Sequence, residues 1–184
     1  MKNALILHGT DSSPEKNWFS WLKQLLEDNG YENVWVPQLP GADSPNMTTY
    51  KEFLMAGDFE FGAETLLIGH SSGAVAVLSV LEALPEGTKI DTAIMVGVYR
   101  PEIKHYSSTE ELDASKIKNK AKRFVFLHSD DDPYCPLEHA EYFANELGGE
   151  LVVSAGQDHF SNFIKPVHST IPEIARILNV EIHS

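Results

Sequence analysis

The sequence predicts an α/β fold in which helices cover both faces of one parallel β-sheet. Short apolar runs alternate with longer segments of helical periodicity along the whole chain, which is typical of a parallel sheet with crossover helices. Most of these runs are nearly continuous in apolar residues, as expected for strands buried on both faces. No repeat, linker or low-complexity segment interrupts the pattern, so residues 1–184 are expected to form one domain.

Six apolar runs are the predicted strands of this sheet. They cover Ala4–His8, Val34–Pro37, Thr65–Gly69, Thr92–Val98, Phe124–His128 and Leu151–Ser154. Because crossover connections are right-handed, few topologies are open to such a chain, and a six-stranded parallel sheet is the expected outcome. Reactive side chains in these sheets lie just beyond the carboxyl ends of the strands, so the residues that follow each strand are the candidates for a functional site.

The segments between the runs carry the predicted helices. The first helix ends near Asn29-Gly30 and has one apolar stripe, formed by Trp18, Trp21, Leu22, Leu25 and Leu26. The other helices are predicted at Thr48–Ala56, Ala74–Leu84, Leu137–Leu147 and Ile171–Leu178. The helix over Ala74–Leu84 is apolar nearly all round and is therefore expected to be buried against the sheet.

Composition and charge narrow the range of partners. Asp and Glu outnumber Lys and Arg by 27 to 14, and the net charge of −13 repels nucleic-acid backbones and anionic membranes. The apolar run near the N-terminus is too short for a signal peptide, and no stretch approaches the roughly 18 apolar residues of a membrane span. Cys135 is the only cysteine, which is typical of a reducing compartment. We therefore expect a cytoplasmic protein with no nucleic-acid or membrane partner.

A G-x-S-x-G motif follows the third predicted strand, at Gly69-His70-Ser71-Ser72-Gly73. In this turn the nucleophile adopts a strained conformation between strand and helix, and the neighbouring chain passes too closely for a side chain two residues away. The apolar strand before the motif and the apolar helix after it fit this context. The sequence thus predicts Ser71 as a nucleophile, with a Ser-rich turn that has no chemistry as the alternative.

A nucleophilic serine needs an orienting acid and a base, which follow it in the order Asp, then His, in proteins with this motif. Three carboxylates come after the fifth strand, at Asp130, Asp131 and Asp132. We predict Asp132 as the acid because the following Pro133 pushes it into an extended geometry, whereas the other two are expected in a solvated acidic loop. A calcium site is disfavoured, since consecutive aspartates lack the alternating spacing of a binding loop. His159 follows the sixth strand and is the predicted base.

Acyl transfer also needs two backbone N–H donors for an oxyanion. One is expected from Ser72, and the other from the loop after the first strand, where Thr10 is the preferred donor. The candidate substrate-binding residues are His70, Trp18, Tyr99, Tyr106 and Phe160, with ordinary core packing as the alternative for each aromatic residue. Four histidines in polar or helical surroundings are expected at the surface, namely His105, His139, His168 and His183. No metal or organic cofactor is expected.

Taken together, these motifs resemble those of the retinoblastoma-binding-protein-nine-like serine hydrolases, a compact branch of the α/β-hydrolase superfamily. The matching segments are the motif Ile68–Ala74, the acid loop Ser129–Pro136, His159-Phe160 and the paired tryptophans in Trp18–Trp21. The resemblance implies an α/β-hydrolase fold with sheet order 2-1-3-4-5-6 and no cap domain. It also implies catalytic roles for Ser71, Asp132 and His159, in agreement with the choice made from the residues.

Two positions depart from the pattern of the family. The first loop begins His8-Gly9-Thr10 where close relatives are rich in glycine, and Asp158 stands where a glycine usually precedes the catalytic histidine. The segment Tyr99–Lys122 is too short for a cap domain and is expected to form a small lid-like excursion.

The predicted function is hydrolysis of a small-molecule acyl substrate, a carboxylic ester with thioesters and amides as alternatives, through an acyl-enzyme intermediate. A second hypothesis is a protein-binding module on a hydrolase scaffold, because a fold does not prove its chemistry. Labelling with a fluorophosphonate probe separates these two hypotheses. A nucleotide-binding protein is disfavoured, since no G-x-G-x-x-G motif follows the first strand.

Overall fold

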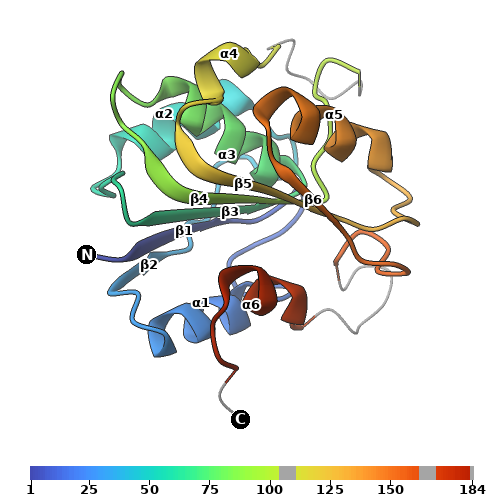
Figure 1. The fold of residues 1–184 in the computed structure, drawn as a ribbon, viewed down its shortest axis with the longest axis horizontal. Coiled ribbons are helices and arrows are strands. Elements are labelled where there is room, and N and C mark those ends of the chain that lie inside the picture. Colours follow the sequence, from blue (N-terminus) through green and yellow to red (C-terminus); the bar gives the residue numbers. More distant parts are fainter. Residues whose placement is uncertain (104–110, 162–168, 183–184) are drawn as a thin grey trace.

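The computed structural model describes residues 1–103, 111–161 and 169–182 and contains one six-stranded parallel sheet between two layers of helices (Figure 1). The strands are β1 (Asn3–Leu7), β2 (Asn33–Trp35), β3 (Thr65–His70), β4 (Ile90–Val96), β5 (Ala121–His128) and β6 (Glu150–Val153). Their order is β2-β1-β3-β4-β5-β6, and every neighbouring pair is parallel. This order confirms the predicted topology.

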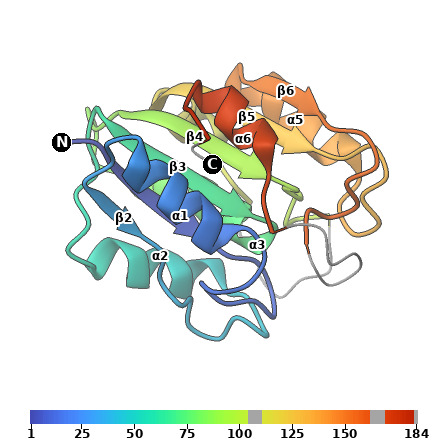
Figure 2. The same ribbon diagram turned by 90° about the horizontal axis from the view of Figure 1, so that it is seen from below.

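The helices are α1 (Phe19–Asp28), α2 (Met47–Ala56), α3 (Ser72–Ala83), α4 (Ala114–Ile117), α5 (Leu137–Leu147) and α6 (Pro172–Leu178). Helices α2 to α5 cover one face of the sheet, and α1 and α6 cover the other (Figure 1). In the view from below, α1 lies towards β1 and β2, and α6 lies towards β5 (Figure 2). The sheet is therefore buried on both sides, which explains why its strands are continuously apolar rather than alternating.

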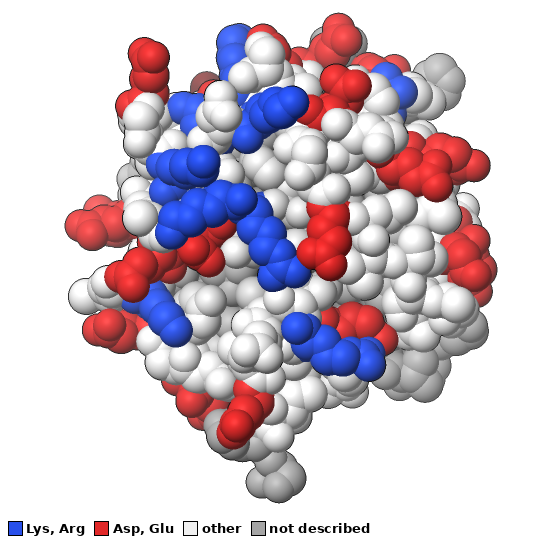
Figure 3. Space-filling view, viewed as in Figure 1, with Lys and Arg blue, Asp and Glu red and all other residues white. Residues whose placement is uncertain are grey.

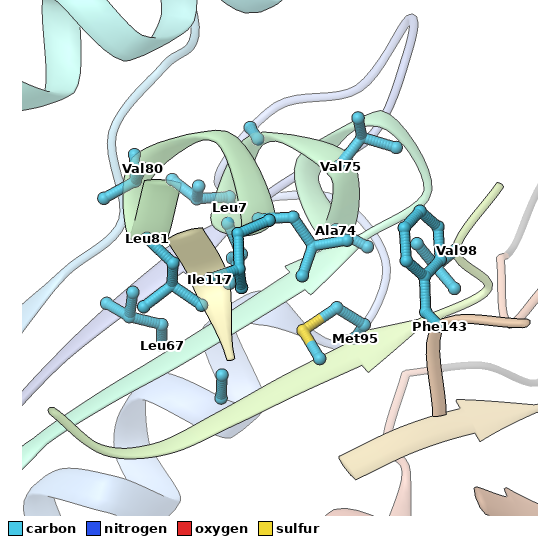
Figure 4. Close-up of a cluster of buried hydrophobic side chains, with 14 of the residues drawn as sticks. Leu7, Leu67, Ala74, Val75, Val80, Leu81, Met95, Val98, Ile117 and Phe143 are labelled. Carbon is cyan, nitrogen blue, oxygen red and sulfur yellow. The ribbon is translucent and has the colours of Figure 1, made fainter. Parts of the chain in front are cut away.

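The core above the sheet is built around α3. Its first ten residues are all buried, because the helix packs on the sheet and is flanked by its neighbours α2 and α4. Figure 4 shows Ala74 and Leu81 of this helix facing Leu67 and Met95 from the strands below. The predicted burial of this helix is confirmed.

The short helix α4 was not expected from the sequence. It begins where the Asp113 side chain accepts the backbone N–H of Ser115 at 3.0 Å, and its Ile117 is fully buried beside α3 (Figure 4). Residues 111–122 of the expected lid-like excursion thus pack against the core instead of forming a lid. Residues 104–110 of the same segment lie outside the described residues.

Five strands begin earlier than predicted, and β4 and β5 do so by two residues or more because charged residues interrupt the apolar pattern at their starts. Strand β4 begins at Ile90 and β5 at Ala121, and the charges at these starts are exposed and paired across the sheet. Lys122 contacts Asp91 at 3.0 Å, and Arg123 contacts Glu150 at 2.7 Å. Apolar patterning does not reveal such strand ends, since they lie at the rim of the sheet in contact with water.

Surface charge is unevenly distributed on the face drawn in Figure 3. Lys and Arg side chains gather on the side where the strands begin, whereas Asp and Glu side chains are spread around the outline. The candidate site lies at the opposite end, where the strands finish. In the part of the chain that the structure describes, no helix is long and apolar enough to cross a membrane.

Candidate active site

Ser71 occupies a sharp turn between the end of β3 and the start of α3. Its backbone has φ 55° and ψ −117°, and its N–H donates to the carbonyl oxygen of Val96 at 2.9 Å. A Cβ added to Gly69 would lie 2.2 Å from the carbonyl oxygen of Gly73, and one added to Gly73 would lie 2.3 Å from that of Leu7. No side chain fits at either position, so the glycines of the motif are required by close backbone approach, as predicted.

His159 and Asp132 are joined directly. The ring Nδ1–H donates to Asp132 Oδ2 at 2.7 Å, and the side chain of Asp132 is fully buried. The other carboxylate oxygen, Oδ1, accepts the backbone N–H groups of Tyr134 and Cys135, each at 2.9 Å. These bonds fix the orientation of the carboxylate. They also leave Nε2 as the proton acceptor of a neutral imidazole.

The environment of Asp132 favours its charged form. Burial acts to raise its pKa, but the hydrogen bond and charge of His159 and the two backbone N–H groups outweigh burial, so the pKa lies below its ordinary value. A second histidine, His128, also lies near this carboxylate. Its Nε2 donates to the carbonyl oxygen of Cys135 at 2.7 Å and is 3.8 Å from Asp132 Oδ2. Burial lowers the pKa of His128, so this ring is neutral at pH 7.

The loop that carries the predicted base has an unusual backbone. Asp158 and Phe160, on either side of His159, both have positive φ, at 49° and 51°. Left-handed conformations are costly for residues other than glycine. Asp158 and Phe160 therefore adopt this conformation at a cost that the surrounding contacts must offset.

The run of aspartates after β5 contacts this loop. Asp130 and Asp131 are exposed, as expected, yet each accepts a backbone N–H from the loop, Asp130 from Gly156 and Asp131 from Asp158, both at 2.9 Å. The two carboxylates are thus solvent-exposed, as expected, and in addition they hold the backbone of the loop that carries His159. Their charge is used to satisfy the N–H groups of an irregular loop, which no helix or strand would pair.

A cavity of about 700 Å³ opens above Ser71 and His159. Its walls come from the loop after β1, the turn at Ser71 and the segments after β4, β5 and β6. The lining residues are Gly9, Thr10, Asp11, Ser12, Glu15, Lys16, Asn17, His70, Ser71, Tyr99, Tyr134, His159 and Ser161. A volume in this range suits a small organic ligand. Three predicted substrate-binding or oxyanion residues, Thr10, His70 and Tyr99, line the cavity.

Two other predicted pocket residues do not line it. Trp18 and Phe160 are fully buried in the core below the sheet, and they are joined by a hydrogen bond from the indole N–H of Trp18 to the carbonyl oxygen of Phe160 at 3.0 Å. Core packing, the alternative considered for aromatic residues, describes both. Tyr106 lies outside the described residues. His139, expected at the surface, is instead buried and accepts the backbone N–H of Arg100 at 3.1 Å.

The two predicted oxyanion donors lie next to each other. The hydroxyl of Thr10 donates to that of Ser72 at 3.2 Å, which ties the loop after β1 to the first turn of α3. Among the described residues, the backbone N–H groups of Thr10 and Ser72 have no hydrogen-bond acceptor. Thr10 lines the cavity, and Ser72 directly follows the lining residue Ser71 at the N-terminus of α3, where the helix favours negative charge.

Sequence reasoning missed several residues of the site. Tyr134 lines the cavity with its ring centroid 5.3 Å from that of His159, and its place directly after Asp132-Pro133 was a signal that it would lie there. Gly97 at the end of β4 has φ 59°, and a Cβ there would lie 3.2 Å from the His159 ring. Gly97 was missed because the predicted strand Thr92–Val98 ran past the observed end of β4 at Val96 and so included this glycine.

One group of side chains in the described part of the chain has the composition of a metal site. Ligand atoms of Asp132, Cys135 and His159 lie within 4.8 Å of one another. Two of these residues already share the short hydrogen bond described above, so an ion there would have to break it. The geometry therefore fits acid–base chemistry in which an imidazole, held by a carboxylate, faces a serine across one cavity.

The fold is that of the α/β hydrolases. Over 97% of both chains, the structure is similar to the ydeN gene product of Bacillus subtilis, with a TM-score of 0.88 and 23% sequence identity. It is also similar to the esterase domain of a Rhodothermus marinus protein, with a TM-score of 0.64 and 19% identity over 96% of this chain and 87% of that chain.

The chain belongs to the serine hydrolase family, whose pattern it matches over residues 4–180. Two relatives have low sequence identity to this chain over most of its length. YdeN of Bacillus subtilis strain 168 is 25% identical over 86% of both chains, and the serine hydrolase RBBP9 of Rattus norvegicus is 24% identical over 79% of this chain and 78% of its own. The protein is thus a serine hydrolase, as the resemblance predicted.

Proposed function

We propose that this protein hydrolyses small carboxylic esters through an acyl-enzyme formed on Ser71, with His159 as the base and Asp132 as its orienting acid. The observation that carries the proposal is the 2.7 Å hydrogen bond from His159 Nδ1 to Asp132 Oδ2, because it directs the unprotonated Nε2 away from the acid. Ser71 and His159 line the same cavity, which supports transfer of a proton between them.

In the proposed reaction, Ser71 Oγ attacks the ester carbonyl while its proton passes to His159 Nε2. The carbonyl oxygen becomes an anion that accepts the free backbone N–H groups of Ser72 and Thr10. As the tetrahedral intermediate collapses, the alcohol leaves with the proton from His159 and the acyl group stays on Ser71. Water then attacks this acyl-enzyme with His159 again as base, so the carboxylic acid is released and the serine is regenerated.

The proposed substrate class, carboxylic esters, rests on the chemistry of the site and on the similarity of the fold to that of an esterase domain. An esterase domain is among the proteins with this fold, and the cavity volume of about 700 Å³ supports an acyl or alcohol group larger than acetyl. Thioesters and amides react by the same steps and are the alternatives for the scissile bond.

A pre-steady-state assay with p-nitrophenyl esters of increasing acyl length tests the proposal. An acyl-enzyme predicts a burst of p-nitrophenol equal to the concentration of sites, followed by slower turnover. Ser71→Ala should abolish both phases, since loss of a triad serine costs up to about six orders of magnitude in rate. Ser72→Ala should keep most of the activity because Ser72 acts through its backbone. An active Ser71→Ala variant would contradict the proposal.

A further inference from the structure

Residues 156–160 carry the proposed base and are called the base loop. Side chains from other parts of the fold accept the backbone N–H groups at the start of this loop and donate to the carbonyl groups at its end. Three consecutive backbone N–H groups each find a side-chain acceptor in the acid loop. They are the bonds from Gly156 to Asp130, from Gln157 to Ser129 and from Asp158 to Asp131, at 2.9, 2.8 and 2.9 Å. The N–H side of the loop is thereby fixed to the end of β5.

Two ring N–H groups fix the next two carbonyl groups of the base loop. His70 Nε2 donates to the carbonyl oxygen of His159 at 2.7 Å, and Trp18 Nε1 donates to that of Phe160 at 3.0 Å. These donors come from different parts of the fold, since His70 precedes the nucleophile and Trp18 precedes α1. Both are buried, with 3% and 0% of their surface exposed, so water does not compete for the bonds.

The base loop has a backbone that would not be stable alone. The left-handed φ values of Asp158 and Phe160 are unfavourable for residues with a Cβ and persist only where surrounding contacts impose them. A bond to the carbonyl on each side of the Phe160 Cα, one at residue 159 and one at residue 160, fixes the orientation of the chain at this point. The direction of the His159 side chain follows from that orientation.

We propose that Trp18 and His70 are positioning residues that hold the base loop, so that the His159 ring stays aligned with both Ser71 and Asp132. The proposal rests on the proposed function in so far as it assigns a catalytic consequence. Trp18 lies outside the cavity and cannot act by touching the substrate; His70 lines the cavity, and its proposed positioning role is exerted through the backbone carbonyl of His159. Misalignment of a base by a fraction of an ångström lowers the rate without weakening substrate binding.

Trp18→Phe removes the N–H and keeps an aromatic ring, and Trp21→Phe, three residues further along in α1, is the matched control. The side chain of Trp21 is half-buried against the same core, and its indole makes no hydrogen bond to the residues that the structure describes. We expect Trp18→Phe to lower kcat about tenfold with KM unchanged, the effect of one lost buried hydrogen bond, and Trp21→Phe to leave kcat within about twofold of wild type. Equal effects of the two variants would overturn the proposal.

Introducing Trp18→Phe into the Asp132→Asn variant separates a positioning role of Trp18 from a general loss of packing. In Asp132→Asn the base is already misoriented, so adding Trp18→Phe should lower kcat no further if Trp18 acts only through His159. If Trp18→Phe lowers kcat as much in the Asp132→Asn variant as in wild type, the substitution damages the protein in another way and the proposal is overturned.

His70 provides an independent arm if Trp18→Phe fails to fold. Gln can place an amide N–H near the position of Nε2, whereas Phe keeps the ring shape without a donor. His70→Gln should therefore retain most of kcat, and His70→Phe should lose about tenfold, the same effect as for Trp18. A His70→Phe variant as active as His70→Gln would overturn the role of His70.

Backbone amide exchange tests the positioning role without catalysis. The N–H of Phe160 donates to Gln157 within the base loop and should exchange faster in Trp18→Phe than in wild type or Trp21→Phe. Unchanged exchange would overturn the proposal even if kcat fell. If wild type hydrolyses no ester, the proposed function is overturned. Faster amide exchange at Phe160 in Trp18→Phe would still support the proposal that Trp18 stabilises the base loop.

Discussion

The carboxylate of Asp131 accepts the backbone N–H of Asp158 at 2.9 Å, beside the 2.7 Å bond that joins Asp132 to His159. Neighbouring aspartates thus support the same loop in different ways. Asp131 holds its backbone, while Asp132 holds the ring of the proposed base. Asp130, one residue earlier, holds the loop further from His159, through Gly156.

This division predicts a graded series for substitution by asparagine. Asp132→Asn should lower kcat/KM about 10⁴-fold, because an Asn there favours the wrong imidazole tautomer. Asp131→Asn should cost about tenfold through one weakened bond, and Asp130→Asn should cost less than Asp131→Asn because its bond lies further from His159. Steady-state kinetics on the three variants provides the test. Equal losses at all three positions would favour a shared electrostatic or metal role, and activity that survives EDTA would separate the two.

The hydroxyl link between Thr10 and Ser72 should contribute little to the rate, since the proposed oxyanion donors are backbone groups. Thr10→Val and Ser72→Ala each remove the 3.2 Å bond and should lower kcat/KM by only a few-fold. Because both variants break one bond, the double variant should be no slower than the slower single variant. A loss near 10²-fold in either single variant would mean that a hydroxyl itself binds the oxyanion.

The motif glycines should be far less tolerant than a glycine in open space. Gly148 has φ 66° and would offer an added Cβ no contact within 4 Å, so Gly148→Ala should cost only the left-handed strain, about 1 kcal/mol of unfolding free energy. Gly69→Ala must displace backbone atoms and should cost at least about 3 kcal/mol. Urea unfolding of the two variants measures the difference. Equal destabilisation would show that the turn at Ser71 is looser than the structure describes.

Stability should fall on the acid side of neutrality because of two buried histidines. Burial lowers the pKa of both His8 and His128, so below about pH 6.5 the unfolded chain binds protons that the folded chain does not. Stability is therefore highest above that pH. It should decrease as the pH falls towards the folded-state pKa values, by at most about 1.4 kcal/mol per pH unit for each histidine.

His128→Gln keeps a donor for the Cys135 carbonyl and cannot be protonated. Its unfolding free energy should therefore depend less steeply on pH than that of wild type between about pH 6.5 and 5, and His8 should account for much of the slope that is left. Urea titrations at a series of pH values supply the slopes. An unchanged slope in the variant would show that His128 takes up a proton equally in both states.

Much of the fold followed from patterns along the chain. A six-stranded parallel sheet and the buried helix after Ser71 were predicted from apolar runs and right-handed crossovers, whereas the order of the strands was implied by the resemblance to the serine hydrolase family. The starts of β4 and β5 were not predicted, since their charged residues break the apolar pattern. Helix α4 was missed because four residues are too few to show a helical period.

The candidate site was predictable where chain order constrains it and not where contacts cross the fold. Ser71, Asp132 and His159 each follow a strand and could be placed from that fact. Trp18 was assigned to the pocket because nothing in the sequence shows that its indole bonds to a carbonyl 142 residues away. His70 likewise stands next to the nucleophile in sequence, but its acceptor lies 89 residues away.

The central claim is that Ser71 is the nucleophile of this serine hydrolase, and covalent labelling tests it most directly. A fluorophosphonate probe should add one adduct to the wild-type protein, and peptide mass spectrometry should locate it on Ser71. Ser72→Ala should label at nearly the wild-type rate, His159→Ala should label far more slowly, and Ser71→Ala should not label. An adduct on Ser72, or labelling that persists in Ser71→Ala, would contradict the claim.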